Sequence, residues 1–161
     1  MRKIYLVGSI DEEAFLNFCE KLDELEASPK PVEMILNSPG GSALDALAFY
    51  SRIKNSKCPI NITVYGCCYS AAVLVLAAGH ARRMTRESWV MVHEDSTTLK
   101  NRDTTNIEKE ADQMRRNENQ WNALLEKNSN ITFQKWEYMH KSTTYLNARE
   151  CLEIGLIEEI V

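Results

Sequence analysis

Residues that could together carry out acyl transfer occur in three separate segments of this sequence. Ser70 begins an almost wholly apolar segment, and His93 ends the apolar segment 89–93. A glycine pair, Gly40-Gly41, occupies a turn between an apolar segment and an expected helix. A nucleophilic hydroxyl, an imidazole that can take its proton, and free backbone amides are the groups that acyl transfer requires. The segments therefore indicate such a site, provided that the fold brings them together.

Each of these features also has an ordinary structural explanation. Paired glycines leave N–H groups free at a helix start, which suits an oxyanion or a phosphate, but they also form tight turns. A serine at a helix start is most often an N-cap, and a histidine at a strand end is usually a polar terminus that faces water. The spacing from Gly66 to Ser70 is longer than that of the G-x-S-x-G turn of α/β-hydrolases. The hypothesis of an acyl-transfer site therefore rests on the combination of these residues and not on any one of them.

The remaining reactive side chains indicate neither a metal site nor a second nucleophile. The 5 cysteines include no C-x-x-C pair, so neither a disulfide framework nor a zinc site is expected. Cys67 and Cys68 end an apolar segment and are interpreted as small apolar filling. His80 and His140 are interpreted as surface residues. We expect no metal and no cofactor.

Apolar periodicity predicts the elements that position these residues. Short apolar runs predict strands, and apolar residues three, four or seven apart predict helices. Strands alternate with helices, which is typical of an α/β fold with mainly parallel pairing. No repeat or linker divides the sequence, so 1–161 is interpreted as a single domain. Strands are expected in 4–7, 32–36, 60–65, 82–84, 89–93, 145–146 and 156–161, and helices in 15–25, 43–53, 70–78, 107–125, 132–141 and 148–154.

Composition excludes several classes of function. The 161 residues are 44% hydrophobic and 26% charged with a net charge of -4, the balance of a globular protein that closes a core without disulfides. The charges are interspersed and mildly acidic overall, so they predict no basic surface that would bind nucleic acid. The longest apolar stretch, 71–79, is far shorter than the ~20 residues that span a bilayer, and the N-terminus forms no signal-peptide core. We therefore expect a cytoplasmic protein with neither a nucleic-acid nor a membrane partner.

Four blocks of the sequence resemble the proteolytic subunit of the Clp protease, in the same order and at similar spacing. The likeness runs from about Ile4 to Val161. It implies a crotonase-like spiral of β-β-α units with a protruding handle helix, the handle segment lying in about 97–130. The blocks are Asn37-Ser38-Pro39-Gly40-Gly41, Gly66-x-x-x-Ser70-Ala71-Ala72, Met91-Val92-His93 and Leu146-Asn147-Ala148-x-Glu150-x-x-x-x-Gly155-Leu156-Ile157.

The resemblance also implies an activity. Members of this family are serine endopeptidases, and by position Ser70 is the nucleophile and His93 the general base. The backbone N–H groups of Gly41 and Ala71 form the oxyanion hole by the same correspondence. The implied substrate is a peptide or an unfolded protein, and no cofactor is implied.

The family assembles as two stacked rings, so the resemblance implies a homo-oligomer whose rings meet at the handle, near Met114 and Trp121. It also implies a separate AAA+ ATPase as a partner. The sequence begins at its first expected strand, without the N-terminal segment that helps the family engage the ATPase, which weakens that expectation.

The sequence departs from the family at the catalytic aspartate, whose position is Thr143, two residues before Tyr145. A threonine hydroxyl can accept a hydrogen bond from imidazole but supplies no negative charge, so attenuated activity is expected. Two alternatives stay open. One is a catalytically weak or inactive structural subunit. The other, less favoured, is a crotonase-type acyl-thioester enzyme, which shares the fold but normally uses carboxylates in place of a Ser–His pair.

Overall fold

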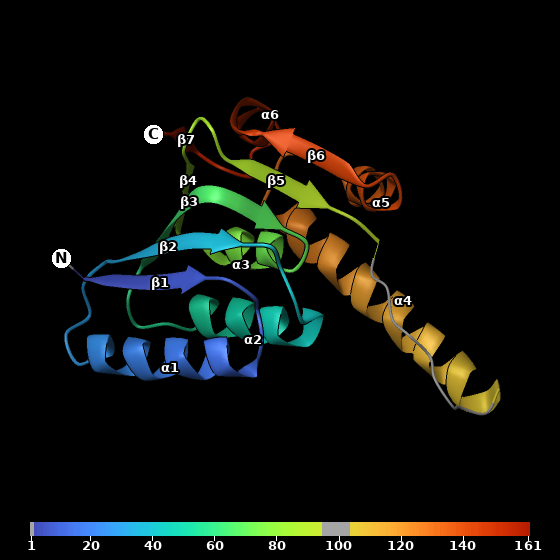
Figure 1. Cartoon of the computed structure of the whole chain (residues 1–161), viewed down its shortest axis with the longest axis horizontal. Coiled ribbons are helices and arrows are strands. Elements are labelled where there is room, and N and C mark those ends of the chain that lie inside the picture. Colours follow the sequence, from blue (N-terminus) through green and yellow to red (C-terminus); the bar gives the residue numbers. More distant parts are fainter. Residues whose placement is uncertain (1, 95–103) are drawn as a thin grey trace.

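The computed structural model describes residues 2–94 and 104–161, which form alternating strands and helices (Figure 1). The predicted α/β class is confirmed, and most predicted elements are present within a few residues of their expected bounds. The elements are β1 (Lys3–Val7), α1 (Glu12–Glu26), β2 (Val32–Ser38), α2 (Ala43–Lys54), β3 (Ile60–Tyr69), α3 (Ala72–Ala78), β4 (Ala81–Met84), β5 (Trp89–Val92), α4 (Thr104–Lys127), α5 (Phe133–Lys141), β6 (Thr144–Asn147), α6 (Ala148–Glu153) and β7 (Glu159–Ile160).

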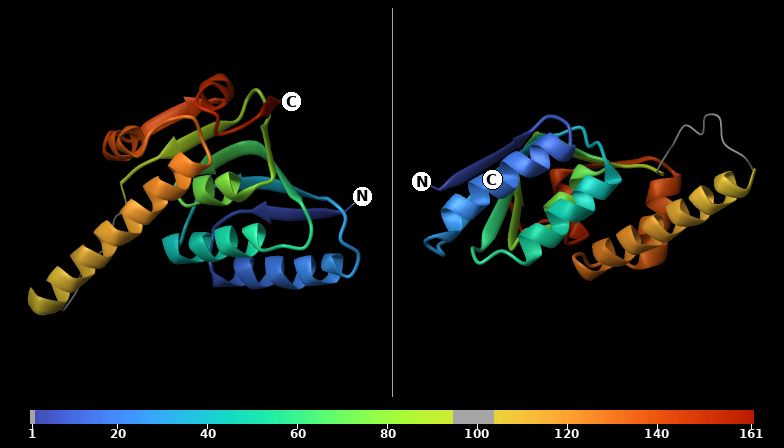
Figure 2. Two further views of the ribbon diagram at one scale, coloured as in Figure 1. Left: turned by 180° about the vertical axis from the view of Figure 1, so that it is seen from behind. Right: turned by 90° about the horizontal axis from the view of Figure 1, so that it is seen from below.

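The strands of the described residues form one mixed sheet that branches at β3. The strands β1-β2-β3-β4-β7 are hydrogen-bonded in that order, and all of these pairs are parallel. The first half of β3 pairs with β4, whereas its second half pairs with β5, to which β6 adds in antiparallel fashion. The helices α1, α2 and α3 lie together on one side of the parallel strands (Figures 1 and 2). The branch directs the carboxyl end of β3 and β5 toward the same corner of the molecule.

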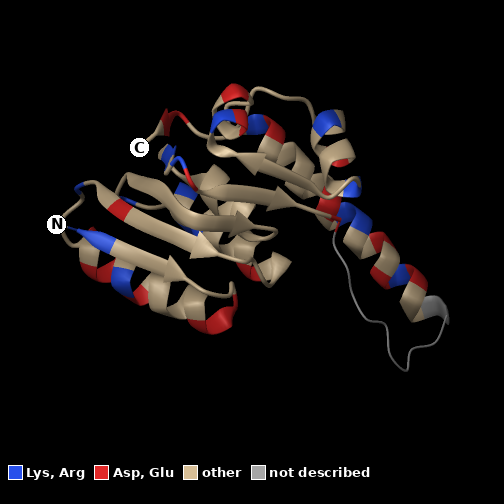
Figure 3. Ribbon diagram, turned by 45° about the horizontal axis from the view of Figure 1, so that its top comes forward, with Lys and Arg blue, Asp and Glu red and all other residues tan. Residues whose placement is uncertain are grey.

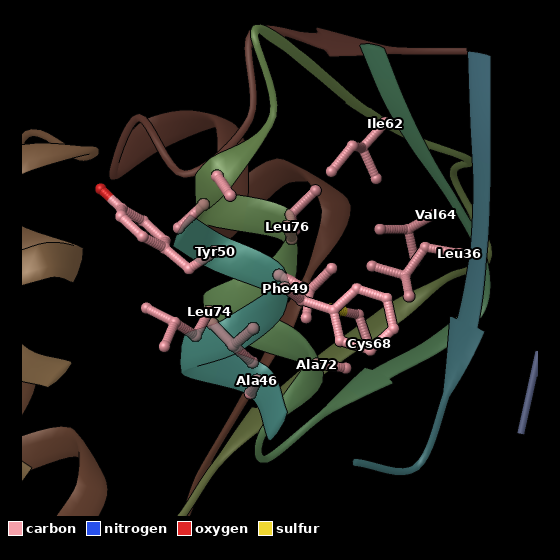
Figure 4. Packing of buried hydrophobic residues seen from close by; sticks show 14 of the residues in the cluster. Leu36, Ala46, Phe49, Tyr50, Ile62, Val64, Cys68, Ala72, Leu74 and Leu76 are labelled. Carbon is pink, nitrogen blue, oxygen red and sulfur yellow. The ribbon is translucent and has the colours of Figure 1, made fainter. Parts of the chain in front are cut away.

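The core lies between the sheet and these helices. Alternate residues of β2 are buried, as expected for a strand with one face on the core. Figure 4 shows Leu36, Ile62 and Val64 of the sheet facing Phe49 of α2 and Leu76 of α3. All seven residues of α3 are apolar and buried. Close packing on every side holds α3 in place, and with it the junction between β3 and α3.

The long helix α4 projects away from the body of the molecule (Figures 1 and 2). It carries positive and negative side chains along its length (Figure 3). Its C-terminal part contacts α3 and α5, and Leu125 is completely buried there. The predicted protruding handle helix is therefore present, although residues 97–103 of the predicted handle segment lie outside the described residues. No described helix has the length and apolarity that crossing a membrane requires.

The predicted boundary between the third strand and the helix that follows it is wrong. The strand was expected to end at Tyr65 and the next helix to begin at Ser70, but β3 continues to Tyr69 and α3 begins only at Ala72. Gly66 suggests a break in the strand, but its N–H donates to the Ser88 hydroxyl. Beyond Gly66, β5 pairs with the rest of β3. Tertiary pairing thus extends the strand through a local break.

Candidate active site

Ser70 lies in a tight junction between β3 and α3, and not within the helix as expected. Its backbone is in the left-handed region, with φ of 53°, which costs a residue other than glycine about 1–2 kcal/mol. Its N–H donates to the Met91 carbonyl of β5 at 2.7 Å. Backbone strain of this kind persists only where the surroundings enforce it, and it is concentrated at functional sites.

His93 follows β5 directly and reaches Ser70. Its Nε2 lies 2.8 Å from the Ser70 hydroxyl, and its Nδ1 lies 2.6 Å from the backbone carbonyl of Glu94. A carbonyl only accepts hydrogen bonds, so in the neutral ring Nδ1 carries the proton and Nε2 carries the lone pair. This tautomer is the one that can take the proton from the Ser70 hydroxyl.

The glycine turn lies against the Ser70 junction. A Cβ at Gly40 would lie 2.6 Å from the Tyr69 carbonyl oxygen and 2.8 Å from the Ser70 Cβ, so only glycine fits there without displacing the junction. Gly41 is held by a parallel bridge to Ile10. No hydrogen bond among the described residues uses the N–H of Gly41 or of Ala71. Gly41 and Ala71 line the same pocket as Ser70, so their N–H groups are candidate donors for an oxyanion hole.

Thr143 lies near His93 but is not bonded to it. Val92 and Thr144 face each other in the β5–β6 pair, so His93 and Thr143 follow one step beyond that pair. Thr143 is exposed and has a φ of 48°. Among the described residues no hydrogen bond joins its hydroxyl to His93, and the Glu94 carbonyl occupies the ring nitrogen that the family's aspartate would contact.

A pocket opens directly onto the Ser70–His93 pair. The four candidate residues that line it are Ser70, His93, Gly41 and Ala71, and Thr143 is not among the lining residues. The opposite wall comes from α4 and α5 and includes Trp121, Asn122 and His140. Figure 1 shows how α4 and α5 meet near the end of β5. The sequence therefore predicts the residues at the base of the pocket but not those of its outer wall.

One of these wall residues contradicts its sequence-based interpretation. His140 was expected on the surface, but it is half-buried, its Nδ1 donates to the Trp136 carbonyl, and burial lowers its pKa. Trp121 lines the same pocket and its indole N–H is buried within the subunit, while its place near the contact between rings stays a prediction. Helical spacing identifies a packed face of α4 but not what that face packs against.

The cysteines near Ser70 do not compete with it as nucleophiles. Burial raises the pKa of the Cys67 thiol, and it raises that of the completely buried Cys68 much further. Both therefore stay protonated at neutral pH, and a protonated thiol is a poor nucleophile. This agrees with their interpretation as small apolar filling. Within residues 2–94 and 104–161 no group of three or more His, Cys, Asp or Glu side chains could hold a metal ion.

The chain is similar to known proteins in both sequence and structure. Residues 1–161 match the Clp protease family. The chain is 31% identical over 138 residues to the ATP-dependent Clp protease proteolytic subunit 3 of a Synechococcus species, with 84% of this chain and 69% of that protein covered. It is 28% identical over 166 residues to subunit 1 of Protochlamydia amoebophila, covering 99% and 80%. A solved ClpP1 mutant from Listeria monocytogenes superposes with a TM-score of 0.91 at 21% identity, over 99% of this chain and 91% of that one, which shows a shared fold.

Proposed function

Because this chain belongs to the Clp protease family, we propose that it is a serine endopeptidase in which Ser70 is the nucleophile and His93 the general base. One observation carries the proposal: the 2.8 Å contact between the Ser70 hydroxyl and His93 Nε2. A serine hydroxyl is a weak nucleophile unless a neighbouring base takes its proton, and this contact supplies that base.

The proposed reaction begins when the Ser70 oxygen attacks a substrate carbonyl carbon and His93 Nε2 takes the hydroxyl proton. The negative charge that develops on the carbonyl oxygen is accepted by the N–H groups of Gly41 and Ala71. The tetrahedral intermediate then collapses, the C–N bond breaks, and His93 gives its proton to the leaving amine. Water repeats the sequence on the acyl-enzyme and regenerates Ser70.

The Glu94 carbonyl defines how this site differs from a Ser-His-Asp triad. It orients the imidazole and selects the Nδ1–H tautomer, which is one task of the aspartate. It carries no full negative charge, so it stabilises the imidazolium less than a carboxylate does. We therefore propose an active but slow peptidase. A purely structural role would not require a serine held at a φ of 53° against a histidine of the correct tautomer.

We also propose that the protein works as a homo-oligomer of stacked rings. The face of the sheet turned away from α1, α2 and α3 exposes large apolar side chains, and few charges lie on those strands in Figure 3. Large apolar side chains left exposed on the subunit are suited to burial against another subunit. Light scattering should show an assembly many times the subunit mass, and a clean monomer at micromolar concentration would contradict the proposal. The side chains, between 44% and 66% exposed, are Tyr5, Val7, Tyr65, Trp89 and Tyr145.

The substrate class and the partner are proposed from the family, and the compartment is proposed from the family and the cysteines. We propose peptides or unfolded proteins as substrates and the cytoplasm as the compartment, where the five free cysteines would stay reduced. A separate AAA+ ATPase stays a prediction of the family resemblance.

The activity is tested by hydrolysis of a fluorogenic peptide ester by the assembled protein. Ser70→Ala and His93→Ala should each lower kcat/KM to the background rate. Ser28→Ala is the matched control, because Ser28 is exposed in the loop between α1 and β2, remote from the pocket. Hydrolysis that survives Ser70→Ala in a correctly assembled variant would contradict the proposal.

A further inference from the structure

Strand β3 contains a bulge shortly before Ser70. Leu36 of β2 lies opposite Val64 of β3, and two residues later Ser38 lies opposite Cys68. Two steps along β2 therefore correspond to four steps along β3, so β3 carries two additional residues at this point. Bulges bend the strand that contains them and are common beside active sites, where they redirect a side chain. The bulge in β3 ends directly before the junction that holds Ser70.

The bulge coincides with the branch of the sheet. Before it β3 pairs with β4, and after it β3 lies beside β5 (Figure 1). Tyr69 lies opposite Met91, whose carbonyl accepts the Ser70 N–H. His93 follows Met91 by two residues. The bulge therefore sets the register that brings Ser70 to His93, and a slip of one residue would turn the side chains of this part of β3 to the opposite face.

Two side chains bind the backbone of the bulge, one from each side. The Gly66 N–H donates to the Ser88 hydroxyl at 2.8 Å. The Cys67 N–H donates to the Asn37 Oδ1 at 3.1 Å. Asn37 belongs to β2, and Ser88 ends the turn between β4 and β5. A backbone N–H that leaves the ladder of a sheet needs another acceptor, and these side chains supply one for each of the two residues.

Asn37 is closely fitted to the bulge. A Cβ at Gly66 would lie 3.0 Å from the Asn37 Oδ1, so the amide packs directly against the backbone of position 66. The Cys67 thiol also donates to this oxygen, with Sγ at 3.3 Å, and it stays protonated because burial raises its pKa. Both lone pairs of Oδ1 are thus used on Cys67. The Asn37 carbonyl accepts the Gly8 N–H at 3.0 Å, which fixes the backbone of Asn37 to the end of β1.

Ser88 supports the other side of the bulge and is completely buried. Besides accepting from Gly66, its hydroxyl lies 3.3 Å from the Val64 carbonyl and 2.6 Å from the Thr85 hydroxyl. A hydroxyl donates one hydrogen bond and accepts two. Ser88 therefore donates to Val64 and accepts from Gly66 and Thr85. Its full set of hydrogen bonds fixes the bulge to the turn that leads into β5.

We infer that Asn37 is a positioning residue for catalysis, because it holds the β3 bulge in the shape that directs Ser70 to His93. Ser88 does the same from the other side. The inference rests on the proposed function and adds residues that act through Ser70, since neither Asn37 nor Ser88 lines the pocket. Without the Asn37 acceptor the Cys67 N–H loses its partner, and the bulge relaxes and displaces Ser70. A displacement of about 1 Å can slow an enzyme by about 100-fold.

The test is the rate at which a fluorophosphonate modifies Ser70 in the assembled protein, measured by mass spectrometry over a range of reagent concentrations. The range separates the affinity for the reagent from the rate constant of modification. Asn37→Ala removes the acceptor, so it should lower the rate constant at least about 10-fold with little change in affinity. Asn37→Asp keeps an oxygen for the Cys67 N–H and should therefore react within a few-fold of wild type.

Asn61→Ala is the matched control. Asn61 lies on β3 before the bulge, is half-buried like Asn37, and donates from Nδ2 to Glu33 at 2.6 Å. The substitution removes a side-chain hydrogen bond of β3 and leaves the bulge intact, so the rate constant should equal that of wild type. Thermal unfolding of each variant reports stability separately. Partial unfolding lowers the fraction of protein that is labelled and not the rate constant, which distinguishes positioning by Asn37 from a merely structural role.

The possible failures are distinguishable. An Asn37→Ala variant that reacts as fast as Asn61→Ala overturns the inference and leaves Ser70 as the nucleophile. An Asn37→Asp variant as slow as Asn37→Ala overturns the assignment to the Oδ1 acceptor. If Asn37→Ala does not assemble, Ser88→Ala tests the bulge from its other side: it should slow modification at least about 10-fold, and an unchanged rate constant overturns the inference. If the reagent does not modify Ser70 in the wild-type protein, the proposed function fails and the inference falls with it.

Discussion

Replacing Thr143 by aspartate should accelerate the reaction, because it would bring a negative charge to the imidazole. His93 and Thr143 lie one step beyond the Val92–Thr144 pair on adjacent antiparallel strands, which places the new carboxylate beside the ring. The backbone accepts the change, since Thr143 has a φ of 48° and aspartate adopts the left-handed region more readily than a β-branched residue does.

The size of the gain follows from what the site already has. In a Ser-His-Asp protease, making the acid neutral lowers kcat by about 10⁴-fold, partly because the imidazole adopts the wrong tautomer. Here the Glu94 carbonyl already fixes the tautomer, so only the charge is missing. A pair of unit charges about 4 Å apart is stabilised by about 1 kcal/mol in water and about 4 kcal/mol near a protein surface. Because Thr143 is exposed, we expect a gain in kcat of roughly 10- to 100-fold.

The assay is hydrolysis of the fluorogenic peptide ester by wild type, Thr143→Asp and Thr143→Asn, with the assembly of each checked by light scattering. Asparagine has the same shape and the same tolerance of the left-handed region but no charge, so Thr143→Asn should stay within a few-fold of wild type. Equal rates for the aspartate and asparagine variants would refute the argument that a missing charge limits the reaction.

Two further predictions concern the scaffold. Gly40→Ala should lower stability by about 2 kcal/mol more than Gly8→Ala, because the two glycines have φ of 96° and 97° but only Gly40 has atoms within 4 Å of a new Cβ. Equal shifts in the urea midpoint would contradict the close contact. Arg52 holds the pKa of Glu26 at about 2, below its ordinary 4.5, so this carboxylate stabilises the fold above pH 4.5 and the contribution is lost as the pH falls through 2. Glu26→Gln should therefore cost about 1 kcal/mol at pH 7 and flatten the loss of stability between pH 5 and 2, measured by thermal unfolding; an unchanged acid profile would contradict this.

The sequence predicts those parts of the fold that local patterning controls. The alternation of apolar strands and amphipathic helices predicts the α/β class, and the stripe from Ile107 to Leu125 predicts the long helix that is α4. The end of β3 is mispredicted, because Gly66 is a local break signal and the pairing with β5 that overrides it is a tertiary interaction. The local pattern around Gly66 gives no information about β5, which follows later in the chain and pairs with the end of β3.

The candidate site is likewise predictable only in part from the sequence. Ser70 and His93 are predictable because serine and histidine are residue types that carry out acyl transfer. Both also lie in blocks of the sequence that resemble the family. The Glu94 carbonyl is not predictable, since every residue has a carbonyl and only the conformation after β5 directs this one to the imidazole. Asn122 gives no signal either, because a polar residue next to an apolar helical stripe is ordinarily solvent-exposed.

The activation of Ser70 by His93 is the central claim, and covalent labelling by a fluorophosphonate tests it most directly. The native assembly is treated with the reagent, digested, and mapped by mass spectrometry. We predict one phosphonylated residue, Ser70, whose labelling is lost in Ser70→Ala and strongly slowed in His93→Ala. Labelling spread evenly over several serines, or labelling of Ser70 at an unchanged rate in His93→Ala, would contradict the account.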